Sequence, residues 1–342
     1  MKRESLLDDV RSRVDARLAG FFELKRLDAE RISKESVVVV DEIASLTMRG
    51  GKRVRPAVLF AGLRCASDAA TLADVLDACA ALELLQSYLL IHDDWMDSDA
   101  ERRGGPTTHV SLARHYADPH RGASVAILAG DLASAWSLEL LAGARWPRGR
   151  ELEGSRAFAR MQEEVVLGQH LDVVGHRDVA LVHHLKTGSY TVRGPLALGG
   201  ILGDADEIQL DALEAFGEPM GIAFQLRDDL LGTFGDPAAT GKPTGNDLRA
   251  GKRTALIEEA EKALFGTIRG PLDAVLGHAE ATDEQIALAT ALLVDCGAKA
   301  RVEARLDTML EDAARALDGG TLRTGGVAML RELRESLARR DR

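Results

Sequence analysis

The stretch Leu84–Asp97, LLQSYLLIHDDWMD, is an apolar run that ends in three aspartates. Read as a helix, it places Asp93 and Asp97 on one face, because residues four apart are helical neighbours, and Asp94 about 100° round. Carboxylates at the end of an apolar helix are costly to desolvate unless a cation neutralises them. Oxygen ligands of this kind suit Mg²⁺ or Mn²⁺ rather than zinc. The stretch therefore predicts a divalent-metal site at the mouth of an apolar channel, with a solvated acidic helix face as the alternative.

A second acidic pair, Asp228-Asp229, follows another apolar helical run, MGIAFQLR. Gln225 lies three residues before Asp228 and therefore on the same helical face, where its amide oxygen could add a ligand. A repeat of the first pattern would need an aspartate at position 232, and this chain has Gly232. Arg227 beside the pair leaves a salt-bridged helix surface as the alternative.

Each acidic segment runs into a loop that carries glycines and cations. The first loop is Ser98–Thr108, SDAERRGGPTT, and the second is Gly235–Lys252, GDPAATGKPTGNDLRAGK. A further basic segment, Gly50–Pro56, reads GGKRVRP. Glycines let the backbone approach an anion, and arginine forks hold phosphate oxygens. Together the acidic and basic segments predict more than one diphosphate held around a shared metal centre.

The composition predicts an all-α chain. Aromatic residues make up only 4%, Ala and Leu recur at helical spacing, and strand-like alternation is nearly absent. No linker or low-complexity tract divides the 342 residues, so we expect a single domain over residues 1–342. We expect helices at 4–32, 36–48, 55–66, 70–97, 121–145, 151–175, 191–202, 206–234, 253–265, 283–298, 299–317 and 325–340.

Several classes of protein are disfavoured. The net charge of −11 argues against a nucleic-acid partner. Cys65, Cys79 and Cys296 form no CxxC pair and indicate reduced thiols in a cytoplasmic protein. No uncharged run reaches the ~20 residues of a membrane span, and the charged N-terminal segment has no signal-peptide block. The chain also lacks a nucleophile elbow, a Walker A loop and a GxGxxG unit, which removes hydrolase, P-loop and dinucleotide functions.

Taken together, the motifs resemble those of the trans-isoprenyl diphosphate synthases, also called polyprenyl synthetases. In chain order the matching blocks are GGKRVRP (50–56), LQSYLLIHDDWMDSDAERRGGPTTH (85–109), AILAGD (126–131), GQHLD (168–172), KTG (186–188) and FQLRDDLLGTFGDPAATGKPTGNDLRAGKR (224–253). Their number and order make the resemblance specific, whereas a single DDxxD would not. The resemblance implies an all-α isoprenoid-synthase fold, with helices around a deep central cavity, and a homodimer.

The resemblance also implies a Mg²⁺-dependent reaction. In this family the metal draws the diphosphate off an allylic substrate, the double bond of isopentenyl diphosphate attacks the resulting carbocation, and a proton is lost. Three Mg²⁺ ions are implied, with Mn²⁺ able to substitute. Asp93 and Asp97 match the ligands of two ions, with Asp94 supporting them. Asp228 matches the ligand of the third, with Asp229 beside it.

The remaining site residues are implied to bind the substrates. Contacts to the allylic diphosphate are implied for Arg102, Lys186 and Lys242. The isopentenyl diphosphate pocket is implied to contain Lys52, Arg55, Gln86 and Arg103. Oxygen dipoles that steady the carbocation are implied at Thr187 and Gln225, a loop cation that closes over the site at Lys252, and the cavity wall at Gln169 and Asp172.

Product length is expected to depend on the residues before the first aspartate. Tyr88 and Leu89 lie roughly one helical turn, about 5.4 Å, before Asp93, where bulky side chains would form a floor for the growing chain. This pair with an uninterrupted DDxxD resembles geranylgeranyl (C20) synthases. A C15 product, a C25 or longer product, and a Tyr88 that merely packs against a neighbouring helix stay open as alternatives.

Two other functions also stay open. A class I terpene cyclase shares the fold and a first DDxxD, but the GGKRVRP block and the second aspartate pair argue against it. A non-catalytic partner subunit of a synthase usually lacks one acidic motif, whereas both cores persist in this chain. Gly232 keeps that alternative open and puts the geometry of the third metal in question, although we expect catalysis to survive.

Overall fold

Helices make up most of the computed structural model, which describes residues 5–235 and 244–338. Within these residues the only strands are β1 (Glu101–Arg102) and β2 (Gly105–Pro106), which pair antiparallel. The all-α prediction is therefore confirmed. The chain divides into two compact units. The expectation of a single domain stays a prediction, because independent folding of either unit is what would test it.

The first unit consists of Met1–Gln162, Gly194–Leu213 and Thr321–Glu332. Its elements are α1 (Leu6–Ile32), α2 (Lys34–Met48), α3 (Val54–Ala66), η1 (Leu72–Asp74), α4 (Leu76–Met96), β1, β2, α5 (Thr108–Tyr116), α6 (Pro119–Ala142) and α9 (Gly194–Leu202). Three helices contribute residues to both units, namely α7 (Glu151–Val173), α10 (Glu207–Phe234) and α17 (Thr324–Ala338). Side-chain caps start several of these helices: Ser5 and Asp118, for example, accept backbone N–H groups at the beginning of α1 and α6.

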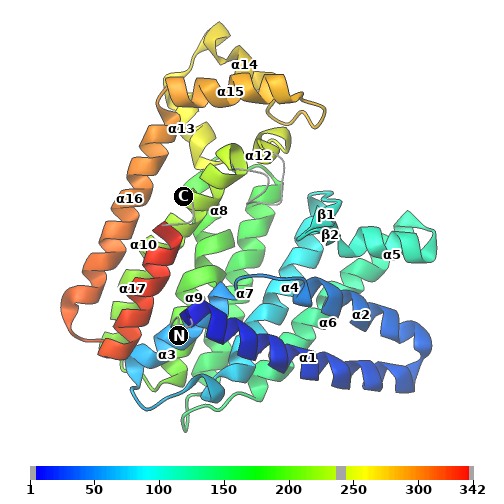
Figure 1. Ribbon diagram of the computed structural model, residues 1–342, viewed down its shortest axis with the longest axis vertical. Helices are drawn as coiled ribbons and strands as arrows, with labels where there is room; N and C mark the ends of the chain where they lie inside the picture. The colour runs from blue at the N-terminus through cyan, green and yellow to red at the C-terminus, as the bar shows by residue number, and fades with distance from the viewer. Residues whose placement is uncertain (1–4, 236–243, 339–342) are drawn as a thin grey trace. The chain divides into compact units, whose positions relative to one another are not determined.

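The core of the first unit surrounds α4. Cys79, Leu82, Leu84 and Leu85 are all fully buried, so α4 is covered on more than one side. It lies beside α6 (Figure 1) and also contacts α1 and α3. This packing fixes the C-terminal end of α4, where the first aspartates stand.

α6 is the one helix in the described part of the chain that is long and apolar enough to cross a membrane by length and composition. Of its most apolar stretch, 44% is buried. Ala126, Ala129 and Ala133 are buried on α6, which packs against α4 and α5. A helix in the core of a protein can have the same length and apolar composition as a membrane span. The burial of α6 therefore supports the prediction of no membrane span. The exposed face of α6 still carries Leu128 and Leu138, which are 61% and 49% exposed.

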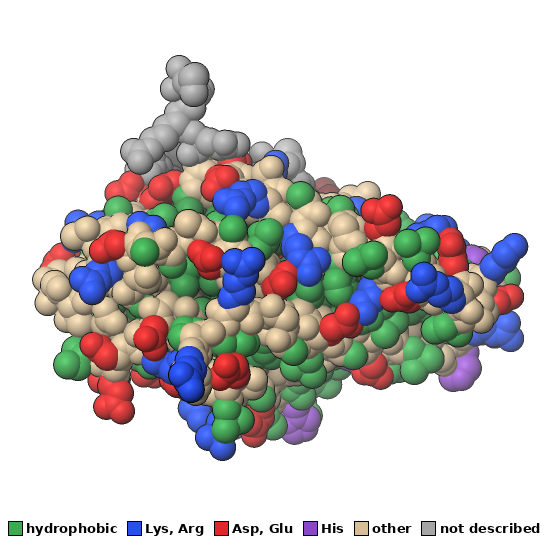
Figure 2. Space-filling view, turned by 90° about the horizontal axis from the view of Figure 1, so that it is seen from below, with side chains coloured by type: hydrophobic (Ala, Val, Ile, Leu, Met, Phe, Trp, Pro, Cys, Tyr) green, Lys and Arg blue, Asp and Glu red, His purple; other side chains and the backbone are tan. Residues whose placement is uncertain are grey.

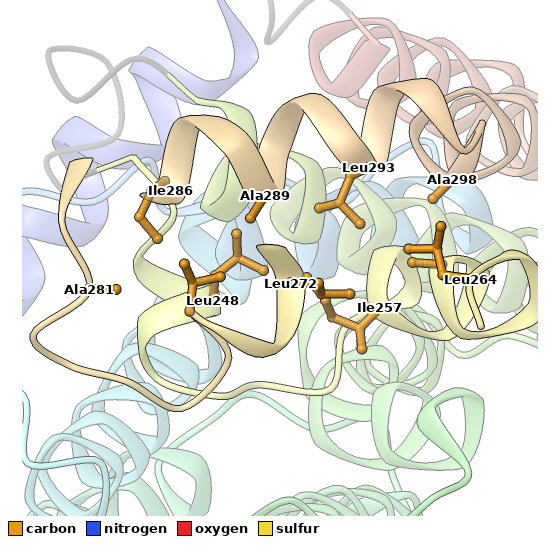
Figure 3. Packing of buried hydrophobic residues seen from close by; sticks show 11 residues of the cluster. Leu248, Ile257, Leu264, Leu272, Ala281, Ile286, Ala289, Leu293 and Ala298 are labelled. Carbon is orange, nitrogen blue, oxygen red and sulfur yellow. The ribbon is translucent and has the colours of Figure 1, made fainter. Parts of the chain in front are cut away.

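The second unit consists of Glu163–Arg193, Glu214–Gly320 and Leu333–Arg342. Its other elements are α8 (Val179–His183), the π-helical segment η2 (His184–Arg193), α12 (Asn246–Arg249), α13 (Ala255–Ala263), η3 (Gly266–Arg269), α14 (Gly270–Asp273), α15 (Asp283–Asp295), α16 (Ala298–Ala316) and η4 (Leu317–Gly319). Figure 3 shows one core of this unit, in which Leu248 of α12 and Ile257 of α13 pack with Ile286 and Leu293 of α15. This core fixes the short α12, which lies within the second basic loop.

Charged side chains of both signs cover the helices. On the face drawn in Figure 2, acidic and basic side chains are interspersed with hydrophobic ones, so the net charge of −11 is not gathered into one patch there. Ion pairs between helical neighbours contribute to this mixture, such as Arg26 with Glu30 at 2.6 Å and Lys262 with Glu258 at 3.0 Å. Exposed pairs of this kind support helices only weakly, because water screens them.

Helix ends and short elements differ from the expected ranges. The helix expected at 70–97 begins only at Leu76, because Thr71 and Asp74 form a capping box around the 3-10 turn η1. Several elements were not expected at all, namely β1, β2, α5, α8, η2 and α12. The short ones contain too few residues for a periodic pattern, and a π-helical segment does not follow the period of 3.6 residues.

Candidate functional site

The first acidic segment ends α4 in the first unit. Asp93 is partly buried, with 19% of its side chain exposed, and Asp97 caps the C-terminus of the helix. The Asp97 N–H donates to the Asp93 carbonyl oxygen at 2.8 Å, which extends the helical geometry by one residue. The two side chains therefore share a helix face, as their spacing predicts. They are the pair of oxygen donors that α4 offers to a metal ion.

Asp94 instead points into the protein and pairs with Arg102. Its carboxylate is fully buried and accepts a hydrogen bond from Arg102 Nε at 2.5 Å. Burial raises the pKa of Asp94 to about 6, although the Arg102 charge opposes this shift. The second oxygen, Oδ2, has no hydrogen-bond partner among the described residues. Arg102 also approaches Asp93 at 3.8 Å and Asp99 at 3.4 Å, so one guanidinium neutralises the base of the acidic segment.

β1 and β2 form a tight hairpin that carries Arg102 and Arg103. Arg103 and Gly104 make the turn with φ of 53° and 71°. Arg102 reaches back to α4, whereas Arg103 Nη1 donates to the Gly50 carbonyl oxygen at 3.1 Å. The Arg103 guanidinium also lies against Gly51, 3.3 Å from the point where a Cβ would stand. The segment expected to be a loop is thus a hairpin. It places Arg102 beside the first acidic segment and Arg103 beside the basic segment GGKRVRP.

Arg53 fixes the basic segment GGKRVRP from inside. It is 2% exposed and pairs with Glu83 at 2.5 Å and with Asp15 at 2.7 Å. A third hydrogen bond joins Arg53 Nη2 to the Thr47 carbonyl oxygen at 2.8 Å. A buried guanidinium with this many partners serves the structure, and its neighbour Lys52 is the exposed cation of the segment.

Arginines from separate segments gather around Arg103. Burial is the largest cause that lowers the pKa of Arg103. The charge of Glu83 opposes this shift, whereas the charges of Arg53, Arg102 and Arg55 add to it. The structure therefore brings Arg55 and Arg103, two residues of the predicted isopentenyl diphosphate pocket, into one positive region. Gln86, another of the four residues predicted for that pocket, is partly buried on α4. Their binding of that substrate stays a prediction.

Tyr88 lies within a network of polar and aromatic contacts. Its ring meets His92 edge-on, with 5.0 Å between the ring centroids. Burial raises the pKa of Tyr88, and a hydrogen bond with Gln162 opposes the shift. Gln162 Nε2 in turn donates to Ser134 Oγ at 3.0 Å. Tyr88 is thus held by His92 of α4 and Gln162 of α7, and the role of Tyr88 and Leu89 as a floor stays a prediction.

The second acidic pair lies on α10 in the second unit. Asp228 is exposed, whereas Asp229 is 2% exposed. Asp229 accepts hydrogen bonds from Gln225 Nε2 at 2.7 Å and from the Ala255 N–H at 2.8 Å. Burial raises the pKa of Asp229 to about 7, against the effect of these two bonds. Asp228 is therefore the carboxylate of this pair that faces solvent. Because the amide nitrogen of Gln225 bonds to Asp229, the amide oxygen of Gln225 is the atom that could face a cation.

The π-helical segment η2 carries the KTG block. Lys186 Nζ pairs with Asp172 Oδ2 of α7 at 2.5 Å. α7 approaches so closely that a Cβ on Gly168 would overlap the backbone nitrogen of Lys186. Thr187 is partly buried next to Lys186. Three residues predicted for the site, Asp172, Lys186 and Thr187, therefore stand together, and irregular helical turns of this kind are frequent at functional sites.

His183 was missed as a site residue. Only 16% of its side chain is exposed, and its Nε2 atom is 3.7 Å from Asp229 Oδ2. Burial lowers the pKa of His183 to about 4, so its imidazole is neutral at pH 7. No motif spacing links position 183 to position 229, so their proximity could not be predicted from the sequence. The next residue, His184, contacts Glu218 and Arg193 instead.

Of the remaining predicted residues, Lys242 and Lys252 belong to the second basic loop, and Gln169 lies on α7. Lys252 is partly buried, and its N–H donates to the Asp247 carbonyl oxygen at 3.0 Å. Gln169 is partly buried on α7. Lys242 lies outside the described residues.

The carboxylates described above fit a metal ion whose coordination shell is completed by oxygens of the substrate. In the described ranges no three His, Cys, Asp or Glu side chains stand close enough to hold an ion by themselves. Mg²⁺ is commonly held by one or two carboxylates together with substrate phosphates, and Asp93, Asp97 and Asp228 are exposed or partly exposed oxygen donors. The cations next to these donors, Arg102 in the first unit and Lys186 in the second, could neutralise a bound diphosphate.

Comparison with known proteins gives a consistent result. The family model described as polyprenyl synthetase matches residues 37–293. The chain is 32% identical to a geranylgeranyl diphosphate synthase of Methanosarcina mazei over 92% of both chains. It is 34% identical to a short chain isoprenyl diphosphate synthase of Methanocaldococcus jannaschii, over 72% of this chain and 74% of that protein.

Solved structures share the fold over the whole length. A crystal structure of geranylgeranyl pyrophosphate synthase from Corynebacterium glutamicum, complexed with isoprenyl diphosphate and magnesium, is 35% identical. It superimposes with a TM-score of 0.90 over 99% of this chain and 100% of that one. Relatives with longer products also occur, such as a geranylfarnesyl diphosphate synthase of Aeropyrum pernix that is 34% identical over 78% of this chain and 83% of its own.

Proposed function

The chain belongs to the polyprenyl synthetase family, as its motifs predicted, and we propose that it condenses isopentenyl diphosphate with an allylic diphosphate to give geranylgeranyl diphosphate. It is accordingly a trans-prenyltransferase. The observation that carries the proposal is the pairing of carboxylates with two of the cations predicted to contact the allylic diphosphate. Arg102 stands beside Asp93 and Asp94, and Lys186 stands beside Asp172.

The residues have separable roles in this reaction. Bound Mg²⁺ neutralises the diphosphate and makes it a better leaving group. Asp93 and Asp97 would hold two ions and Asp228 a third, with Mn²⁺ able to substitute. When the allylic C–O bond breaks, Arg102 and Lys186 stabilise the negative charge that develops on the departing diphosphate.

The carbon–carbon bond then forms between two bound substrates. Arg55 and Arg103 hold the diphosphate of isopentenyl diphosphate, so that its double bond attacks the allylic cation. The oxygen dipoles of Thr187 and Gln225 steady that cation before the attack. The new bond leaves a positive charge one carbon further on, which is removed when a proton passes to the departing diphosphate. No side-chain nucleophile is needed.

A C20 product agrees with the side chains before Asp93. Tyr88 is held by Gln162 and His92, so its ring is a fixed obstacle roughly one turn before the aspartates. The geranylgeranyl synthases among the relatives favour the same length, whereas the geranylfarnesyl synthases keep a C25 product open as the alternative.

We also propose a homodimer in the cytoplasm. The exposed side of α6 presents Leu128, Ala135 and Leu138 in one helical stripe, an apolar face that a second copy could cover. Cys65 and Cys79 are buried free thiols, which suits a reducing compartment. Light scattering after size-exclusion chromatography should give twice the 36.8 kDa chain mass, and Leu128→Glu should shift it to the monomer. A monomeric wild type would contradict the dimer.

The synthase function is tested by direct product analysis. Purified protein is incubated with Mg²⁺, isopentenyl diphosphate and, separately, C5, C10 or C15 allylic diphosphates, and the products are read as prenol masses. We expect a dominant C20 product, which EDTA abolishes. Asp93→Asn should remove most activity, whereas Asp295→Asn, an equal charge change at the exposed end of α15, should not. The absence of condensation with every primer would contradict the proposal and favour a non-catalytic partner subunit.

A further inference from the structure

We propose that Asp247 supplies the carboxylate that position 232 lacks and so completes the metal site at Asp228. The inference rests on the proposed synthase function, because the metal is part of that function. It addresses the one place where the second acidic segment departs from the first: Asp93 is followed four residues later by Asp97, whereas Asp228 is followed by Gly232.

The geometry shows where the missing carboxylate is. Gly232 lies one turn after Asp228 on the same face of α10. A Cβ built on Gly232 would overlap the Asp247 carboxylate, whose Oδ2 atom is its nearest neighbour. The space in which a side chain at position 232 would begin is therefore filled by an acidic group from elsewhere in the chain. A carboxylate stands beside the helix at the expected turn, although its residue is 15 positions later in the sequence.

Asp247 is held in this place by its neighbours. Leu248, the next residue, is 1% exposed and belongs to the core shown in Figure 3. Arg249 donates to the Ala281 carbonyl oxygen at 3.0 Å and to Asp283 Oδ1 at 2.7 Å. The Lys252 N–H donates to the backbone oxygen of Asp247 itself at 3.0 Å. With α12 fixed by these contacts, the carboxylate is presented to α10 without the freedom of a loop residue.

The charge near Asp228 fits a cation. Asp247 and Asp172 both lie within electrostatic reach of Asp229, the residue next to Asp228. Asp228, which precedes Asp229, and Asp247 are both accessible to solvent. Since no three such groups form a complete cage in the described residues, coordination positions remain for substrate oxygens, as Mg²⁺ sites for phosphates require.

Gly232 is then a requirement of the arrangement rather than a defect. Any side chain at this position would push the Asp247 carboxylate away from α10, because both would occupy the same space. The glycine and Asp247 form a matched pair, and a carboxylate can come from either position but not from both.

The test measures metal binding without turnover. Mn²⁺ is titrated into the full chain in the presence of inorganic pyrophosphate, and bound ion is quantified from the loss of the free-Mn²⁺ electron paramagnetic resonance signal. We expect Asp247→Asn to weaken one class of ions by about 10–100-fold, the usual effect of losing a carboxylate that supports a metal site. Gly232→Ala removes no charge but displaces Asp247, so it should weaken the same class. The swap Gly232→Asp with Asp247→Ser should restore binding to within about 3-fold.

Each result decides the inference. Wild-type binding in both Asp247→Asn and Gly232→Ala would overturn it, as would a swap variant that binds no better than Asp247→Asn. Asp295→Asn is the matched control, and a loss of binding there equal to that of Asp247→Asn would reduce the effect to net charge and also overturn it. Circular dichroism establishes that each variant is folded. If wild-type protein condenses isopentenyl diphosphate while these variants bind Mn²⁺ normally, only the role of Asp247 fails; absent condensation is a failure of the proposed function.

Discussion

Arg102 Nε lies 2.5 Å from Asp94 Oδ1, and this ion pair joins the hairpin of β1 and β2 to the acidic end of α4. The Asp94 side chain is fully buried and that of Arg102 is 16% exposed. A buried carboxylate that loses its cation keeps the cost of desolvation without the compensating attraction. The pair therefore matters for folding as well as for binding of a diphosphate.

Removal of Arg102 alone should be more damaging than removal of both charges. We expect Arg102→Met to lower the free energy of unfolding by about 3–5 kcal/mol, and the double variant Arg102→Met/Asp94→Asn to lower it by less. Urea unfolding at pH 8 measures both, with Arg148→Met as a control at an exposed position. Equal losses in the single and double variants would show that the charge on Asp94 is not the cause.

The stability of the metal-free protein should depend on pH through Asp229. Burial raises its pKa to about 7 from an ordinary value of 3.8, so the folded state holds a proton that the unfolded state releases. This contribution is fully present below pH ~4 and is lost as the pH rises through ~7. Between pH 5 and pH 8 it amounts to roughly 2–3 kcal/mol.

Asp229→Asn removes the titration and keeps the size of the side chain. In EDTA, urea unfolding should show that the variant loses less stability than the wild type between pH 5 and pH 8. The variant should also be the more stable of the two at pH 8, where the wild type carries a buried charge. Parallel pH profiles would show that Asp229 is ionised at both pH values and would contradict the raised pKa.

Long elements with an apolar pattern could be predicted from the sequence, and so could the residues at their ends. α4 and α10 follow from apolar runs that stop at aspartates, and the shared face of Asp93 and Asp97 follows from helical spacing. The hairpin that separates Arg102 from Arg103 could not be predicted, because two-residue strands have no periodicity. The sequence therefore identified both arginines but not that they turn to different partners.

Contacts between residues that are distant in the sequence could not be predicted either. Gly232 looked like the loss of a ligand, because nothing in the chain around it points to Asp247. The proximity depends on the core that holds α12, and such tertiary packing has no local pattern. His183 was likewise missed, because the π-helical segment that follows it and its burial beside Asp229 are not visible in a helical repeat.

Product length should respond to Tyr88. Tyr88→Ala removes the ring and should lengthen the product beyond C20, since space would open before Asp93. Gln162→Leu should give a smaller shift, because it leaves the ring but removes the hydrogen bond that holds it. Prenol masses measure both, and Tyr116→Ala on α5 is the control for loss of a tyrosine. An unchanged product distribution in Tyr88→Ala would remove Tyr88 from this role, with condensation itself unaffected.

Binding of isopentenyl diphosphate should respond to a methyl group at Gly51. The Cβ of an alanine there would stand 3.3 Å from the Arg103 guanidinium and would displace it, and φ of 113° is strained for any residue with a side chain. We expect Gly51→Ala to raise KM for isopentenyl diphosphate by about 10-fold, equivalent to ~1.4 kcal/mol, with little change in KM for the allylic substrate.

Gly50→Ala separates backbone strain from the contact with Arg103. Gly50 also has positive φ, at 77°, but no atom lies within 4 Å of the position of its Cβ. This variant should therefore share the cost of a left-handed backbone while both KM values stay near those of the wild type. A similar rise in KM for isopentenyl diphosphate in both variants would assign the effect to the turn itself. A rise confined to Gly51→Ala would place Arg103 in the isopentenyl diphosphate pocket, because the position of its guanidinium is the feature that only this variant disturbs.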